Sequence, residues 1–228
     1  FVLIYLFFLV IFGLPALMAE FAVGRASGRG IARSFDVLER KGHKWHTAKY
    51  PMLAGNYLLM MFYTTVSGWM FYYFYRMAFV GDLTEMSADQ VGGAFGSMLG
   101  SAGTQTGWMI FATLLGMGIV SLGLQKGVES ITKKMMAALF VIMVLLAIRV
   151  LTLDGAVEGL KFYLLPDFDR MVKNGIGETV FAAMGQAFFT LSLGIGAMTI
   201  FGSYIKKEHS LTKEALWIST LDTVVALL

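Results

Sequence analysis

Long uncharged runs alternate with charged stretches along the whole chain. A transmembrane helix needs about 20 predominantly apolar residues, so each long run predicts one membrane span. The predicted spans are 1–19, 51–75, 104–122, 135–153 and 179–205, followed by the first half of a sixth that begins near Ala215. This pattern predicts an all-α polytopic membrane protein in which 1–228 form a single transmembrane domain, with a bend at Pro15 in the first span. Because the sequence opens and stops inside apolar runs, we expect that domain to be partial.

The fifth run, 179–205, has a centre that is poorly suited to a continuous helix. The residues of that centre are Thr190, Leu191, Ser192, Leu193, Gly194, Ile195 and Gly196. Glycine costs a helix about 1 kcal/mol relative to alanine, and hydroxyl side chains offer the backbone competing hydrogen bonds. Backbone groups freed in lipid are costly, so a break would persist where a binding site uses them. Glycine that only allows close helix packing is the alternative, and the composition leaves it open.

The charged stretches differ in sign along the chain. Three loops are rich in Lys and Arg: 25–50 has seven of these residues, 125–134 has three and 206–214 has three. By the positive-inside rule we expect these three loops to be cytoplasmic, in a multi-pass protein of the cell inner (plasma) membrane. Within the first loop, Ile31, Phe35 and Leu38 recur at helical spacing, which predicts a short amphipathic helix lying on the membrane surface.

The composition excludes several classes of protein. Hydrophobic residues make up 57% of the chain and charged residues 14%, and the mean hydropathy is +0.70, which excludes an ordinary soluble domain. A net charge of +3 is too small to indicate nucleic acid as a partner. There is no cysteine, so disulfides, iron–sulfur clusters and thiol catalysis are excluded. The three histidines lie in charged stretches without zinc-ligand spacing.

Two acids fall within or beside the predicted spans. Asp222 lies inside the sixth, where a charged side chain costs at least ~2.5 kcal/mol, so it is a functional-site hypothesis; a neutral, hydrogen-bonded carboxylic acid is the alternative. Glu20 follows the first span and either faces the interface or accepts hydrogen bonds from an unwound backbone nearby. Tyr63 is too deep in the second span for an interfacial aromatic belt, and its hydroxyl needs a partner. Two isolated acids do not make the paired groups of an enzyme site, so we expect no enzymatic activity.

The centre of the fifth run and its approach read Gln186-Ala187-Phe188-Phe189-Thr190-Leu191-Ser192-Leu193-Gly194-Ile195-Gly196. This segment closely resembles the sixth transmembrane helix of the neurotransmitter:sodium symporter family. Further likenesses follow the family's order, at 15–25, at Phe62-Tyr63 with Trp69, at Lys126-Gly127-Val128-Glu129 and at Leu165-Pro166-Asp167-Phe168. The resemblance implies a partial LeuT-type inverted-repeat fold with a discontinuous sixth helix, running from the family's second helix into its seventh. The family's first and eighth to twelfth helices would then lie outside this sequence.

The resemblance also implies a role for each matching residue. Thr190 and Asp222 match ligands of the sodium ion beside the substrate carboxylate, and Tyr63 matches the tyrosine that holds that carboxylate. The other implied substrate contacts are a pocket wall, an outer lid and the unwound segment, at Leu59, Phe189, Ser192, Leu193, Gly194, Ile195 and Gly196. Support and gating roles are implied for Glu20, which would brace that segment, for Gln186, and for Tyr204 of the cytoplasmic gate.

The function that the resemblance implies is sodium-coupled symport of a hydrophobic L-amino acid, for which an aromatic one is a candidate, into the cell by alternating access. The alternative is a non-transporting amino-acid sensor or receptor on the same scaffold. Two sodium ions are expected, of which only the site at Thr190 and Asp222 is assignable within this sequence. The implied partners are the amino acid, sodium and the lipid bilayer, without nucleic acid, and the oligomeric state is not indicated.

Two residues depart from the bacterial leucine transporter of that family. That transporter has asparagine where this chain has Asp222, and a carboxylate binds a hard cation more strongly than an amide oxygen does. Chloride-dependent members surround the anion with residues at the positions of Tyr5, Gln186, Thr190 and Asp222, so here a carboxylate would supply the negative charge and chloride is not expected. The leucine transporter has phenylalanine where this chain has Ile195, and the smaller side chain leaves room for a bulkier apolar substrate.

Overall fold

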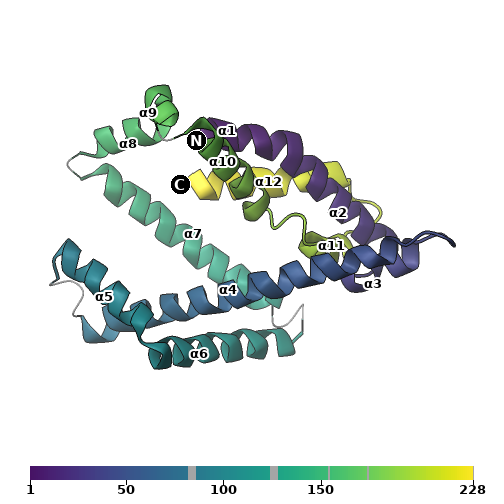
Figure 1. The fold of residues 1–228 in the computed structure, drawn as a ribbon, viewed down its shortest axis with the longest axis horizontal. Helices are drawn as coiled ribbons and strands as arrows, with labels where there is room; N and C mark the ends of the chain where they lie inside the picture. Colours follow the sequence, from purple (N-terminus) through teal and green to yellow (C-terminus); the bar gives the residue numbers. More distant parts are fainter. Residues whose placement is uncertain (82–85, 124–127, 154, 174, 228) are drawn as a thin grey trace. The chain divides into compact units, whose positions relative to one another are not determined.

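A computed structural model describes residues 1–81, 86–123, 128–153, 155–173 and 175–227, and these residues form helices joined by turns and loops (Figure 1). The α-helices are α1 (Val2–Phe8), α2 (Leu14–Ser27), α3 (Ile31–Leu38), α4 (Lys49–Tyr75), α5 (Ala88–Gly100), α6 (Ala102–Ser121), α7 (Ser130–Leu151), α8 (Ala156–Leu164), α9 (Phe168–Lys173), α10 (Ile176–Thr190), α11 (Ala197–Gly202) and α12 (Leu211–Leu227). Short turns of other helix types include η1 (Leu9–Gly13), η2 (Trp45–Ala48) and η3 (Arg76–Val80). The all-α prediction is confirmed.

Most predicted helices occur where the sequence placed them. The second, third and fourth predicted spans correspond to α4, α6 and α7, and the sixth corresponds to α12. The predicted amphipathic helix is α3, which begins at Ile31 and ends at Leu38. Positions 125–127 of the third predicted loop, among them Lys126 and Gly127, lie outside the described residues.

Three helices, α5, α8 and α9, lie between the predicted spans and were not anticipated. α5 begins with a capping box, in which Ser87 Oγ accepts from Gln90 N at 3.4 Å and Gln90 Oε1 accepts from Ser87 N at 2.9 Å. The two bonds satisfy main-chain N–H groups that a helix start leaves free. The Ser-x-x-Gln spacing is legible in the sequence and was the available signal for α5.

Two helical stretches among the described residues are long and apolar enough to cross a bilayer. They are Val2–Ser27, with a mean hydropathy of 2.6, and Ser130–Leu151, with a mean hydropathy of 2.3. The first of them contains the π turn η1 directly before Pro15. Proline has no N–H and its ring clashes with the carbonyl four residues earlier, here that of Ile11. The wide turn accommodates that clash without ending the helix, so the irregularity expected at Pro15 takes the form of a π turn.

The chain forms two compact units. Unit 1 comprises Phe1–Asn56 and Leu139–Leu228, and unit 2 comprises Tyr57–Ala138. In unit 1, α1 packs against α10, and α2 packs against α11, α12 and α3, as the adjacent ribbons in Figure 1 show. The core of this unit is apolar and consists of Tyr5, Leu9, Leu17, Phe21, Ala183, Ala187, Leu191, Leu193 and Ala215.

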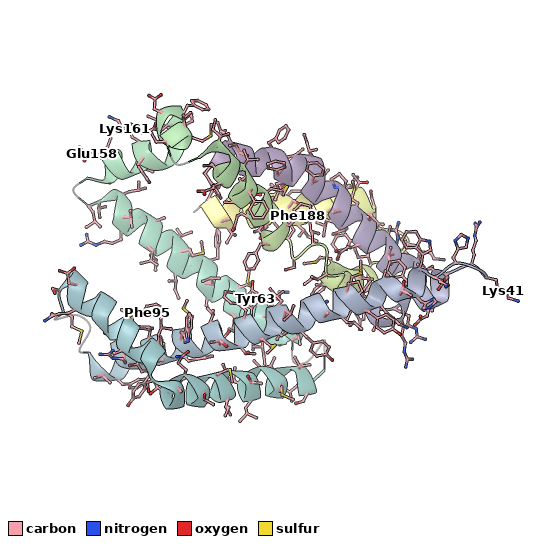
Figure 2. The ribbon with its side chains drawn as sticks, in the orientation of Figure 1. Lys41, Tyr63, Phe95, Glu158, Lys161 and Phe188 are labelled. Carbon is pink, nitrogen blue, oxygen red and sulfur yellow. The ribbon has the colours of Figure 1, made fainter. Side chains whose placement is uncertain are left out.

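Unit 2 contains a close contact between α4 and α6. A Cβ added to Gly68 would lie 2.8 Å from Met109 N, so the two main chains touch at this glycine. Trp69 Nε1 donates to Gln105 Oε1 at 3.3 Å. Phe95 of α5, labelled in Figure 2, meets the Trp69 ring edge to face at 5.8 Å. Helix packing in this unit therefore combines a glycine contact with aromatic side chains.

Glycines also let α2 and α11 approach at main-chain distance in unit 1. A Cβ added to Gly202 would lie 2.6 Å from Phe21 O. A Cβ added to Gly24 would lie 2.9 Å from Ser203 N and closer still to Thr199 O. Small residues at such contacts permit the close approach on which packing between membrane helices depends. The main chain of α11 is therefore held directly against that of α2.

Two acidic side chains, Asp36 and Glu39, hold the connection between α3 and α4 in place through hydrogen bonds and an ion pair. Glu39 accepts from Trp45 N at 3.0 Å and from His46 N at 3.1 Å, and its Oε2 lies 2.6 Å from His46 Nδ1. Asp36 binds Lys49 Nζ through both carboxylate oxygens, each at 2.9 Å. Desolvation raises the pKa of Glu39, but the hydrogen bonds with His46 outweigh it and hold that pKa below its ordinary value. Both acids are thus engaged within the loop itself.

Replacing Gly24 by alanine should destabilise unit 1, because the added methyl group would overlap the Thr199 carbonyl and push α11 away from α2. Overpacking of this kind costs about 1–3 kcal/mol, so we expect a lower midpoint of thermal unfolding in detergent. The control is Gly177→Ala at the start of α10, where nothing lies within 4 Å of the added Cβ. An unchanged midpoint for Gly24→Ala would contradict direct contact between the two main chains.

Candidate functional site

The helix made of α10 and α11 is broken over 191–196. Three residues of the break have left-handed backbone conformations: φ is 53° at Ser192, 86° at Gly194 and 69° at Gly196. Glycine adopts this conformation readily because it has no Cβ, whereas other residues meet steric strain. Ser192 is the one non-glycine residue with positive φ in the described part of the chain. The discontinuity predicted from the sequence is confirmed.

The end of α10 is a Schellman motif. Ser192 N donates to Phe189 O and Leu193 N donates to Phe188 O, both at 3.0 Å, while Ser192 takes the left-handed position. This pair of bonds satisfies the last carbonyl groups of α10 as the chain turns out of the helix. Glycine is the usual residue at that position, so Ser192 gives the sequence no obvious mark of the helix end.

One carboxylate accepts from two of the N–H groups that the break leaves free. Glu20 Oε1 accepts from Gly194 N at 2.8 Å, and Glu20 Oε2 accepts from Met198 N at 3.0 Å. Hydrogen bonds to an ionised group are shorter and stronger than those between neutral groups. An unsatisfied N–H within a membrane is costly, so these bonds offset much of the penalty for the break. Glu20 of α2 therefore holds both the broken segment and the first turn of α11.

Asn56 of α4 donates a hydrogen bond to a main-chain carbonyl that the break leaves free. Its Nδ2 donates to Ile195 O at 2.6 Å. Beside it, a Cβ added to Gly55 would lie 2.9 Å from Ile195 Cγ2, so the Ile195 side chain is seated against the α4 main chain. Sequence reasoning missed Asn56. The available signal was an amide inside the apolar run 51–75, because a polar group in lipid must find a partner.

At the start of the break, α10 meets α12 through a hydroxyl and a carboxylate. Thr190 Oγ1 donates to Asp222 Oδ2 at 2.7 Å, and both side chains are partly buried. One turn before Asp222, the buried hydroxyl of Ser219 has no hydrogen-bond partner. Hydroxyl and carboxylate oxygens are the hard donors that alkali and alkaline-earth cations take. The donor set at this point therefore fits a sodium ion.

The break lies beside the irregular turn in the first helix. A Cβ added to Gly13, the last residue of η1, would lie 3.3 Å from Leu191 Cδ1. Leu191 is the first residue of the break, and its side chain is buried. Packing divides at this point, since α1 contacts α10 and α2 contacts α11. The two halves of the broken helix are supported by the two halves of one irregular helix.

The other residues predicted for the site lie in varied surroundings. The exposed ones in unit 1 are Gln186, Phe189 and Tyr204. The Leu193 side chain is buried in the core, so this residue can offer only its main chain to a ligand, and Gly196 is covered by Ile31. Leu59 and Tyr63 lie on the part of α4 that belongs to unit 2. Tyr63 is labelled in Figure 2, and the substrate contacts of these two residues stay predictions.

Comparison with known proteins identifies the family. Residues 91–228, more than half of the chain, match the sequence profile of the sodium:neurotransmitter symporter family. The chain belongs to this family. As part of a sodium-dependent transporter family it is a membrane protein, in agreement with its composition.

Several relatives match the chain over nearly its whole length. It is 33% identical over 231 residues to the uncharacterised sodium-dependent transporter YhdH of Bacillus subtilis, covering 100% of this chain and 49% of that protein. It is 28% identical over 235 residues to a sodium-dependent transporter of Methanocaldococcus jannaschii, covering 97% of this chain and 45% of that protein. The crystal structure of MhsT in complex with L-phenylalanine matches with a TM-score of 0.87 at 35% identity, over 99% of this chain and 50% of that chain. The chain thus spans about half the length of these relatives, and the predicted partial LeuT-type fold is confirmed.

Replacing Glu20 by glutamine should loosen the break, because one of its two acceptor oxygens becomes an NH₂ donor. A donor left without an acceptor costs about 1–3 kcal/mol where the membrane excludes water from it. Since about 1.4 kcal/mol is a factor of ten, amide hydrogen exchange at Gly194 or Met198 should become roughly tenfold faster.

The matched control is Glu208→Gln, which changes an exposed acid in the loop after α11 and should leave both amides unaffected. Unchanged exchange at Gly194 and Met198 in Glu20→Gln would mean that other acceptors hold these N–H groups.

Proposed function

We propose that the complete protein is a sodium-coupled symporter that carries a hydrophobic L-amino acid into the cell by alternating access, with an aromatic amino acid as a candidate. The observation that supports this most directly is the break between α10 and α11 beside the oxygen pair of Thr190 and Asp222. Main-chain groups at a broken membrane helix can bind the charged groups of a substrate and its coupling ion. The likeness to MhsT, whose structure contains L-phenylalanine, favours the same class of substrate.

In this proposal, Thr190 and Asp222 bind sodium with the oxygens that now share a hydrogen bond. The Thr190 hydroxyl turns its lone pairs toward the ion, and the Asp222 carboxylate supplies the negative charge. Main-chain groups of 192–196 hold the substrate beside the ion, and Tyr63 binds its carboxylate. Leu59 and Phe189 then form the pocket wall and the outer lid, with Gln186 in support and Tyr204 at the cytoplasmic gate.

The sodium gradient supplies enough free energy for accumulation. Inward movement of one positive charge yields about 2.3 kcal/mol per 100 mV. A tenfold sodium gradient adds about 1.4 kcal/mol, and the sum of roughly 3.7 kcal/mol could concentrate a neutral zwitterion several-hundred-fold. Coupling requires that ion and substrate stabilise the same conformer. Thr190 supports such coupling, because it is both an ion ligand and the last residue of α10 before the break.

Two residues tune this site in the proposal. Asp222 provides the negative charge that chloride provides in other members, so transport proceeds without chloride. Ile195 leaves room for a large apolar side chain, because it is smaller than phenylalanine and is seated against Gly55. A second sodium site would be built from the family's first and eighth helices.

The proposal also extends to topology. Residues 1–228 form part of one transmembrane domain in the plasma membrane, and the loops 25–50, 125–134 and 206–214 face the cytoplasm. The charge pattern of these three loops supports this orientation, since they contain 13 of the 18 Lys and Arg residues of the chain.

Uptake into proteoliposomes tests the function. The reconstituted protein should accumulate radiolabelled L-phenylalanine when sodium is high outside, and leucine, phenylalanine and tryptophan should compete better than alanine and glycine. Alanine and glycine ranking first would overturn the assigned substrate class. Sodium-dependent binding without net flux would favour a non-transporting amino-acid sensor instead.

Asp222→Ala should reduce sodium-stimulated uptake to background, at least about tenfold, because the ion site loses the carboxylate that supplies its negative charge. The control Thr223→Ala removes a neighbouring hydroxyl that donates to Ser219 O within the same helix, and it should retain stimulation. Size-exclusion profiles show whether each variant is folded. Full sodium stimulation in a folded Asp222→Ala protein would remove Asp222 from the ion site.

Replacing external and internal chloride by gluconate should leave the initial rate of uptake unchanged, because Asp222 already supplies the compensating negative charge. The comparison is made at constant sodium and constant membrane potential. Loss of uptake in gluconate would show that the carboxylate does not take the place of the anion.

A further inference from the structure

Exposed basic side chains crowd the segment 29–50, which connects α2 to α4. They are Arg29, Arg33, Arg40, Lys41 and Lys44. Among the ion pairs of the described residues, none involves any of these five side chains. Figure 2 shows Lys41 at the tip of the loop between α3 and α4. The segment therefore presents a concentrated positive charge to its surroundings.

The acids that could neutralise this charge are already used within the segment. Asp36 binds Lys49 through both oxygens. Glu39 accepts from the Trp45 and His46 main-chain N–H groups and contacts the His46 ring. These bonds fix the shape of the loop while leaving the five other basic side chains uncompensated.

Large apolar side chains accompany the basic ones. Four of them are exposed: Val37 by 58%, Leu38 by 39%, Trp45 by 62% and Tyr50 by 63%. On α3, Arg33 and Val37 share one face because they are four residues apart. Ile31 and Ser34 of the same helix are buried, with Ile31 covering Gly196 in the break. This packing fixes which face of α3 is directed outward, and that face combines basic and apolar side chains.

The segment lies at the end of a membrane-spanning stretch. It follows Val2–Ser27, and its last residues are the first of α4, which corresponds to the second predicted span. The positive-inside rule places it on the cytoplasmic side, where anionic phospholipids give the membrane surface a negative potential. Clusters of four to eight Lys and Arg next to a transmembrane helix are typical of binding to such lipids.

We infer that the segment 29–50 is a binding surface for anionic phospholipid headgroups of the cytoplasmic leaflet. Arg33, Arg40, Lys41 and Lys44 contact the phosphates, and Trp45 sits at the boundary between headgroups and acyl chains. Guanidinium groups bind phosphate oxygens in pairs, and tryptophan favours the membrane interface. Neither the ion site nor the substrate takes part, so this inference does not rest on the proposed transport activity.

Hydrogen exchange in nanodiscs tests the inference on the full-length protein. Amides of 37–47 should exchange several-fold more slowly in phosphatidylcholine mixed with phosphatidylglycerol than in phosphatidylcholine alone. High salt should remove the difference, because exposed charges are screened over a Debye length of only about 3 Å at 1 M. Equal exchange in both lipids, or a difference that resists salt, would overturn the inference without any substitution in the chain.

Substitutions then test which side chains carry the effect. Combining Arg33→Gln, Arg40→Gln, Lys41→Gln and Lys44→Gln should abolish the lipid-dependent difference. The matched control removes four exposed charges from the other two basic loops by Lys133→Gln, Lys134→Gln, Lys206→Gln and Lys207→Gln, and it should retain the difference. Unchanged exchange in α10 reports that both proteins are folded.

Three outcomes of these variants contradict the proposal. The first is that the lipid-dependent difference in exchange persists in the quadruple variant of 29–50. The second is that the control variant loses this difference to the same extent, which would indicate an effect of net charge alone. The third is the same protection in phosphatidylcholine after soluble glycerol phosphate is added, which would indicate a free-phosphate site instead of a membrane surface.

Discussion

The structure depends on one constraint: a main-chain polar group inside a membrane must find a partner. A helix meets this requirement by itself, and a broken helix does not. Between α10 and α11 the missing partners are side chains, since Glu20 accepts from Gly194 and Met198 and Asn56 donates to the Ile195 carbonyl. Together with the Schellman motif that ends α10, these two polar side chains satisfy main-chain groups that the break would otherwise leave without partners.

The close contacts at Gly24 and Gly202 explain how the single carboxylate of Glu20 reaches both Gly194 and Met198. Glu20 and Gly24 are four residues apart on α2, and Met198 and Gly202 are four residues apart on α11, so each pair shares a helix face. Main-chain contact at the two glycines brings the helices close enough for Glu20 to accept from Met198. The same approach places the second oxygen of Glu20 at Gly194, inside the break. Close packing and hydrogen bonding are therefore parts of one arrangement.

Sequence reasoning found the features that carry an obvious free-energy penalty in a membrane, and it missed those whose penalty is small. The glycine-rich centre of the fifth run and the intramembrane Asp222 were recognised because each carries an energetic penalty that needs an explanation. Asn56 was overlooked because a neutral amide in an apolar run is much less conspicuous than a charge. The helix α5 was overlooked because it lies between two predicted spans, although Ser87 and Gln90 have the spacing of a capping box. The link between Glu20 and the break joins residues 174 positions apart. The sequence offered hydrogen bonds from an unwound backbone as one of two alternatives for Glu20, and only the family resemblance indicated which segment that backbone belongs to.

The π turn at Leu9–Gly13 has a consequence for how one helix serves two neighbours. An α-helix advances about 100° per residue, and a π turn inserts one residue into a single turn. The side chains that follow Gly13 are therefore rotated about the helix axis by about 100° from their positions in an uninterrupted α-helix. With that offset, α1 packs against α10 and its Tyr5 is buried in the core, while Phe21 lies against Gly202 of α11. In a helix without this turn, Phe21 would be rotated by about 100° relative to Tyr5, so the helix could match only one half of its interrupted neighbour.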